Sequence, residues 1–101
     1  MEKRYVMLWG DGVLHAKDNK NIFTREEIVS FFREELFFTE PTVRVSSVFE
    51  DKDEAEEVSF GAFLILLEDA GGMGEKICVW ESEMAERGCD AVEMSLVSVN
   101  I

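Results

Sequence analysis

The sequence predicts a single α+β domain, in which two helices pack on a mostly antiparallel five-stranded sheet in the order β-β-α-β-β-α-β. Short apolar segments bounded by turn residues indicate strands, and one segment carries clear helix-start signals. The length of 101 residues is typical of one domain, and no linker or repeat interrupts it. Residues 1–101 are therefore expected to fold as one acidic α+β unit.

The first two strands are predicted to form a hairpin. Residues 5–9 are an apolar run with high strand propensity, and residues 10–12, Gly-Asp-Gly, are typical of a tight turn. Residues 13–17 would return as the second strand, before a loop at residues 18–21.

The clearest helix is predicted over residues 25–38, ending shortly before Pro41. Thr24 and Glu27 have the spacing of a capping box. In this motif each side chain accepts a hydrogen bond from a backbone N–H that the helix start leaves free. Three aromatic residues lie off the main apolar stripe and are expected to be half exposed, which would favour an interface. They are Phe31, Phe37 and Phe38.

Two further strands are predicted on either side of an acidic connection at residues 50–57. Residues 42–49 alternate in polarity, and Phe49 is among those expected to be buried. Residues 58–67 should pair with them in antiparallel fashion. Most of that segment is an uninterrupted apolar run, which indicates a central strand covered on both faces.

The segment after the glycine-rich stretch allows two interpretations. Apolar residues at helical spacing, closed by Gly88, favour a helix over residues 75–87. Residues 77–80 taken alone are typical of a strand. We expect the helix, followed by a final strand at residues 91–101.

The distribution of charge is the strongest functional signal. Residues 1–49 hold eight acidic and seven basic side chains, whereas residues 50–101 hold fourteen acidic and three basic ones. The net charge of −12 therefore comes almost entirely from the second half. Direct binding to nucleic acid is disfavoured, because such affinity comes from Lys and Arg at phosphates.

Acidic side chains in two segments are the candidate contacts for a basic partner. Same-face neighbours on helices and strands stand about 5–7 Å apart, which is similar to the charge spacing along a nucleic-acid backbone. Such a surface could occupy the nucleic-acid groove of a basic protein. The candidates are Glu50, Asp51, Asp53, Glu54, Glu56 and Glu57 in the connection, Glu83 and Glu86 on the predicted second helix, and Asp90 just beyond the end of that helix.

In size and charge the chain resembles the acidic inhibitors that phages make against restriction or CRISPR effectors. The likeness is one of composition and no particular residue carries it. It implies a protein-binding inhibitor or nucleic-acid mimic whose partner is a nucleic-acid-binding protein. The alternative is a small structural or homo-oligomerising domain, in its simplest form a homodimer, whose acidity serves solubility.

Other functional classes have weaker support. His15 is the only histidine and no nucleophile is placed beside it, so we do not expect an enzyme. Together with Cys78 and Cys89 it is too little for a structural zinc site, and reduced thiols are expected. The glycine-rich stretch at residues 71–76 lacks the Gly-Lys-Ser/Thr order of a phosphate loop. Accordingly, neither a cofactor nor a metal is predicted.

The sequence shows no sign of a membrane protein. Its longest uninterrupted apolar run, at residues 62–67, is far shorter than the roughly 20 residues that a bilayer-spanning helix needs. The first residues do not have the pattern of a signal peptide. A cytoplasmic location is therefore expected.

Overall fold

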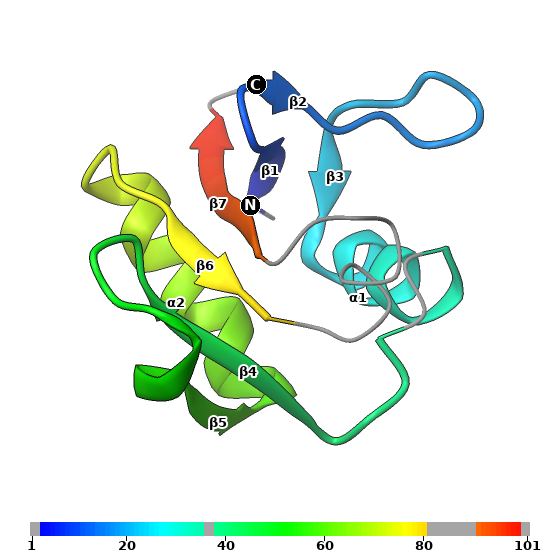
Figure 1. The fold of residues 1–101 in the computed structure, drawn as a ribbon. Coiled ribbons are helices and arrows are strands. Elements are labelled where there is room, and N and C mark those ends of the chain that lie inside the picture. The colour runs from blue at the N-terminus through cyan, green and yellow to red at the C-terminus, as the bar shows by residue number, and fades with distance from the viewer. Residues whose placement is uncertain (1–2, 36–37, 81–90, 100–101) are drawn as a thin grey trace.

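The computed structural model describes residues 3–35, 38–80 and 91–99 (Figure 1). The elements in chain order are β1 (Arg4–Trp9), β2 (Gly12–Val13), β3 (Phe23–Thr24), α1 (Arg25–Glu34), β4 (Thr42–Ser47), the 3-10 helix η1 (Lys52–Glu54), β5 (Glu56–Ser59), α2 (Phe60–Gly72), β6 (Ile77–Val79) and β7 (Val92–Val99). The predicted α+β fold with two helices and a mostly antiparallel sheet is confirmed within these ranges. The predicted five strands and their order are wrong, because the described residues already form a sheet of seven strands.

All the strand pairs between described residues are antiparallel. Its order is β2-β1-β7-β6-β4-β5, and β3 pairs with β1 beside β2. The predicted N-terminal hairpin is present with a shorter second strand, since Trp9 pairs with Gly12 across a two-residue turn. Gly10 occupies that turn with φ at 59°, a conformation that glycine adopts without steric cost. β5 lies at the open edge of the sheet.

Helix α1 begins as the sequence predicts. Thr24 Oγ1 accepts a hydrogen bond from the N–H of Glu27 at 3.3 Å, and Glu27 Oε1 accepts one from the N–H of Thr24 at 2.9 Å. The capping box is therefore complete. The helix ends earlier than predicted, at Glu34.

The aromatic residues at the end of α1 are in the core rather than half exposed. Phe31 and Phe38 are only 7% and 5% exposed. The ring of Phe31 lies 5.6 Å from that of Phe23, and the ring of Phe38 stacks on that of Phe63 at 5.9 Å. The prediction of half-exposed rings is wrong for both, and Phe37 lies outside the described residues.

The predicted central strand over residues 58–67 is wrong, because most of it forms helix α2. Only its first residues are extended, and they belong to β5, which pairs with β4 across the acidic connection as expected. Ser59 caps α2, since its Oγ accepts a hydrogen bond from the N–H of Ala62 at 3.1 Å. The buried positions then follow helical spacing. They are Phe60, Phe63, Leu64, Leu67 and Ala70.

The glycine-rich stretch ends α2 and brings it close to the sheet. Gly71 lies against the backbone of Leu96 in β7, where no side chain would fit. Gly74 has φ at 72°, and the N–H of Glu75 donates to the carbonyl of Ala70 at 2.8 Å, as in a Schellman C-cap. These glycines therefore have structural roles.

The predicted helix over residues 75–87 is also wrong in its first part. Residues 77–79 form β6, which lies between β4 and β7. Trp80 continues this register, because its N–H donates to the carbonyl of Arg44 at 2.9 Å. Residues 81–90 lie outside the described residues. The strand interpretation of residues 77–80 was the correct alternative.

The helices cover one face of the sheet. Side chains from α1, α2 and alternate strand residues form a single buried cluster, in which the rings of Phe32 and Phe63 lie 5.4 Å apart. The opposite face carries Val6, Leu8 and Val97, which are only partly buried. Figure 1 shows α2 on the far side of β4 and β6. Among the described residues, no helix is long and apolar enough to cross a membrane.

Candidate interface for a basic partner

Local hydrogen bonds organise the acidic connection between β4 and β5. Ser47 and Glu50 close a turn, because the N–H of Glu50 donates to the carbonyl of Ser47 at 3.2 Å. A carboxylate oxygen of Glu50 in turn accepts from the N–H of Ser47 at 2.9 Å. Asp51 precedes η1 and caps it, since its Oδ1 accepts a hydrogen bond from the N–H of Asp53 at 3.0 Å. These hydrogen bonds give a defined conformation to the backbone that carries the carboxylates.

All six acidic side chains predicted in this connection are exposed. The strand β5 divides them, however. Glu56 pairs with Val45 and lies toward the helix-covered face, whereas Glu57 pairs with Arg44 and lies toward the opposite face. They therefore form two adjoining surfaces at one edge of the sheet.

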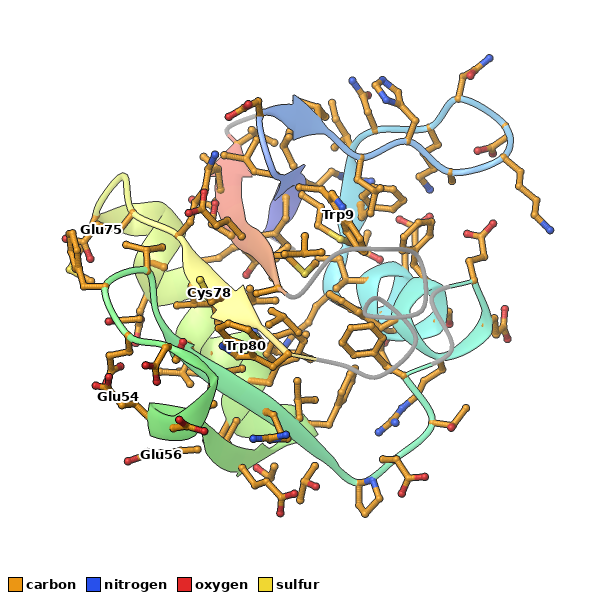
Figure 2. The ribbon with its side chains drawn as sticks, in the orientation of Figure 1. Trp9, Glu54, Glu56, Glu75, Cys78 and Trp80 are labelled. Atoms are coloured by element: carbon orange, nitrogen blue, oxygen red, sulfur yellow. The ribbon has the colours of Figure 1, made fainter. Side chains whose placement is uncertain are left out.

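A groove opens on the helix-covered side of this edge. It has a volume of about 300 Å³, and its apolar wall is formed by side chains that include Val58, Leu66 and Ile77. Glu50, Glu54 and Glu56 also line it. Figure 2 shows Glu54 and Glu56 at the left of the view, on the same side of the molecule as Glu75. An apolar wall beside three carboxylates suits the aliphatic stem and charged end of a Lys or Arg side chain.

Phe49 projects from the same connection into solvent. The sequence predicted it on the buried face of a strand, but β4 ends at Ser47 and Phe49 is 95% exposed. The prediction is wrong because the turn begins before the apolar alternation ends. An exposed aromatic residue thus stands beside the exposed carboxylate of Glu50.

The other three predicted contact residues cannot be placed on this interface. Glu83, Glu86 and Asp90 lie outside the described residues. The helix expected to carry Glu83 and Glu86 is replaced near its start by β6.

Several basic side chains make interactions within the protein. Lys3 and Arg25 both pair with Glu68, at 3.5 and 3.2 Å. The guanidinium of Arg33 donates to backbone carbonyls and lies 4.0 Å from the centre of the Phe60 ring. Among the ion pairs between described residues, none involves a carboxylate of residues 50–57. The six carboxylates of the connection are themselves exposed to solvent.

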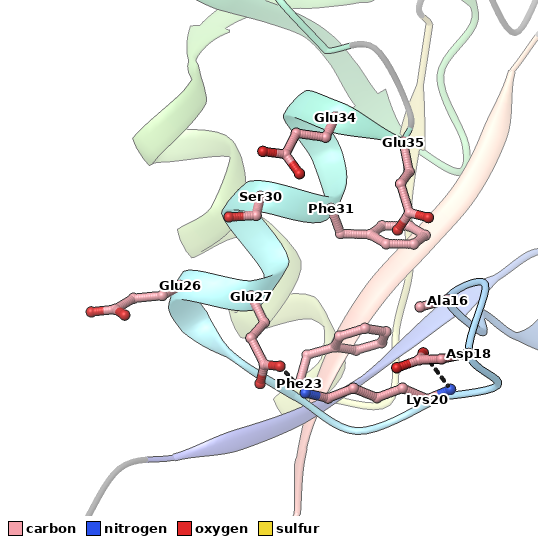
Figure 3. A pocket seen from close by; sticks show the side chains of 10 residues that line it. All are labelled: Ala16, Asp18, Lys20, Phe23, Glu26, Glu27, Ser30, Phe31, Glu34 and Glu35. Carbon is pink, nitrogen blue, oxygen red and sulfur yellow. Dashed lines mark hydrogen bonds and ion pairs between the residues drawn. The ribbon is translucent and has the colours of Figure 1, made fainter.

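A second acidic groove lies between α1 and the loop before β3, and sequence reasoning missed it. It has a volume of about 420 Å³ and includes Phe23 and Phe31 in its lining. Figure 3 shows Glu27 and Glu35 directed from the helix toward this loop. The signal was present in the spacing of Glu27, Phe31 and Glu35, which places them on one helical face. Lys20 already pairs with Glu27 there, so this groove is partly neutralised from within.

Other chemistry has little support in the described part of the chain. No group of three or more His, Cys, Asp or Glu side chains is placed there to hold a metal ion. Cys78 has a free, buried thiol, and Cys89 lies outside the described residues. Burial and then the charge of Glu93 raise the pKa of the Cys78 thiol, while a hydrogen bond with Ser46 opposes them. A raised pKa makes the thiol a poor nucleophile at neutral pH.

Comparison with known proteins identified no relative. No protein-family model, no curated protein and no solved structure matches the chain.

Proposed function

We propose that the protein is an acidic binding module that engages a basic surface of a partner protein through the connection between β4 and β5. The observation that carries the proposal is the contrast between the surroundings of the basic side chains and those of the acidic ones. Bases such as Lys3, Arg25 and Arg33 interact within the chain, whereas the carboxylates of residues 50–57 are exposed. Three of them, Glu50, Glu54 and Glu56, line an apolar-walled groove. A partner that normally binds nucleic acid would offer the complementary Lys and Arg side chains.

Such a module would act by occupying the partner's nucleic-acid groove. Exposed carboxylates attract a basic surface over a Debye length of about 8–10 Å at moderate salt, which accelerates encounter. The groove then offers an apolar wall to a Lys or Arg stem. Inhibition of nucleic-acid binding would follow from occupancy of the same site. This role corresponds to the phage-type inhibitors that the chain resembles in composition.

A homodimer is the second candidate, and one observation favours it. The sheet face opposite the helices carries four partly buried aliphatic side chains around the β1–β7 pair. They are Val6, Leu8, Val97 and Val99. Sedimentation would show a dimer that Val97→Lys dissociates. A wild-type protein that stays monomeric at its highest soluble concentration would exclude this candidate.

The proposed function is tested by salt-graded capture followed by charge reversal. The immobilised protein should retain a basic protein from a lysate of its source cell at low salt and release it at high salt. Added nucleic acid should compete with the captured protein. Retention that is indifferent to both salt and nucleic acid would contradict the proposal.

Charge reversal separates the acidic connection from the net charge. Glu54, Glu56 and Glu57 are all exposed, and changing the three to Lys should leave the fold intact. Association with the captured partner should slow by about tenfold or more at low salt, because these charges act mainly on the on-rate. The matched control changes three exposed carboxylates elsewhere by the same total charge. They are Glu26, Glu34 and Glu40. Equal loss in both triple variants would show that only net charge matters.

A further inference from the structure

Phe49 is the most exposed large apolar side chain in the described part of the protein, at 95%. It follows Val48, which is 38% exposed, so two apolar side chains stand together at the corner of the turn. Carboxylates follow them directly in the sequence, beginning with Glu50 and Asp51. Exposed aromatic residues within a polar rim are a recurrent feature of binding hot spots.

The turn that carries Phe49 is organised before any partner binds. The hydroxyl oxygen of Ser47 accepts a hydrogen bond from the N–H of Phe49 at 3.3 Å. The backbone and side-chain bonds between Ser47 and Glu50 close the same turn on both sides. A turn that is already ordered loses less conformational entropy on association than a flexible one does.

We propose that Phe49 is an apolar anchor that inserts into a pocket on the basic partner, with Lys or Arg side chains around the mouth of that pocket. The inference rests on the proposed function and adds the shape of the partner's site. Charge complementarity argues for this occupant, because a pocket that admits Phe49 must also come close to Glu50 and Asp51. Burial of the ring would hold the complex together after charge attraction has formed it.

A protein surface fits this turn better than a membrane does. A lipid bilayer would also accept an exposed aromatic ring. The carboxylates of Glu50 and Asp51, however, are repelled by anionic headgroups, and insertion of Phe49 would draw both of them toward such headgroups. We therefore expect Phe49 to insert into a pocket on a protein. The experiment also includes a test for lipid binding.

The test uses peptides as defined probes. A phage-displayed library of random peptides is selected on the wild-type protein at low salt, and the selected peptides are synthesised. We expect sequences that combine Lys or Arg with large apolar residues. Their affinity should fall by at least about tenfold in Phe49→Ala, mainly through faster dissociation, with an unchanged salt dependence. The charge-reversed variant of Glu54, Glu56 and Glu57 should instead flatten the salt dependence.

Three other outcomes would each contradict a different part of the proposal. Basic peptides that bind Phe49→Ala as well as wild type would overturn the anchor and leave the proposed function standing. Neutral peptides with no salt dependence would overturn the proposed function itself. Co-sedimentation with phosphatidylcholine vesicles that disappears in Phe49→Ala would show that the anchor serves a membrane instead.

Met73 supplies the matched control. It is 68% exposed at the C-cap of α2, outside the turn that carries Phe49. Met73→Ala removes a comparable exposed side chain and should leave peptide binding unchanged. Phe49→Ala and Met73→Ala should both retain the wild-type thermal midpoint, because neither side chain is buried. Equal loss of binding in the two variants would overturn the anchor.

Discussion

A Cβ atom on Gly71 would lie 1.8 Å from the carbonyl oxygen of Leu96, so helix α2 contacts strand β7 through bare backbone. That contact sets the distance between the second helix and the sheet. It also gives a structural reason for a glycine near the end of a helix, where glycine is intrinsically unfavourable. Because the opposing atom belongs to the backbone, no side-chain rotation can relieve a clash there.

Gly71→Ala should lower the free energy of unfolding by about 1–3 kcal/mol, as expected for overpacking against a fixed neighbour. The measurement is denaturant unfolding followed by circular dichroism. Gly72→Ala is the control, because a Cβ on Gly72 would meet nothing within 4 Å. That variant should be neutral or stabilised by up to about 1 kcal/mol. Equal effects of the two substitutions would contradict the close contact.

Substitutions along α2 should follow helical spacing. Phe63 is 0% exposed and Ile65 is 53% exposed, although a strand would place both on one face. Phe63→Ala should therefore cost about 3–5 kcal/mol of unfolding free energy, and Ile65→Ala about 0.5 kcal/mol or less. Chemical denaturation of the two variants measures the difference. Similar large losses would support the strand that the sequence predicted.

Glu27 should stabilise the fold more through its hydrogen bond at the start of α1 than through its ion pair with Lys20. Its carboxylate accepts the hydrogen bond from the N–H of Thr24 and also pairs with Lys20. Glu27→Ala should cost about 1 kcal/mol, whereas Lys20→Ala should cost about 0.5 kcal/mol or less, because surface ion pairs contribute little. Thermal unfolding at low and high salt compares the two. A larger effect of Lys20→Ala would reverse this assignment.

The Cys78 thiol should make stability fall at alkaline pH. Burial raises its pKa in the folded state, with a smaller contribution from the charge of Glu93. The unfolded thiol loses its proton near pH 8.5, so stability is full below that value and falls as pH rises through the higher folded-state pKa. Unfolding free energies should therefore decline more steeply from neutral to alkaline pH in wild type than in Cys78→Ala. Parallel declines would show that the folded thiol has an ordinary pKa.

The sequence alone determined the features that depend on a few neighbouring residues. The capping box of Thr24 and Glu27 and the turn at Gly10 form as predicted, because each satisfies its hydrogen bonds or backbone geometry locally. The antiparallel pairing of β4 with β5 across the acidic connection was also predictable. Charge counting located the exposed carboxylates of residues 50–57, because ionised groups remain in water.

Tertiary structure decided the elements whose local pattern was ambiguous. The apolar run after Ser59 fits a buried strand or a helix equally well, and the helix forms here because Phe63 and Leu67 pack against the core. Apolar residues recur at helical spacing over residues 75–87, which favours a helix. Residues 77–79 instead form the strand between β4 and β7, where unpaired backbone groups of those strands need partners. The exposure of Phe49 likewise depends on where β4 stops pairing. Each of these outcomes depends on contacts between residues that are distant in sequence. A short segment of the chain is therefore not enough to predict them.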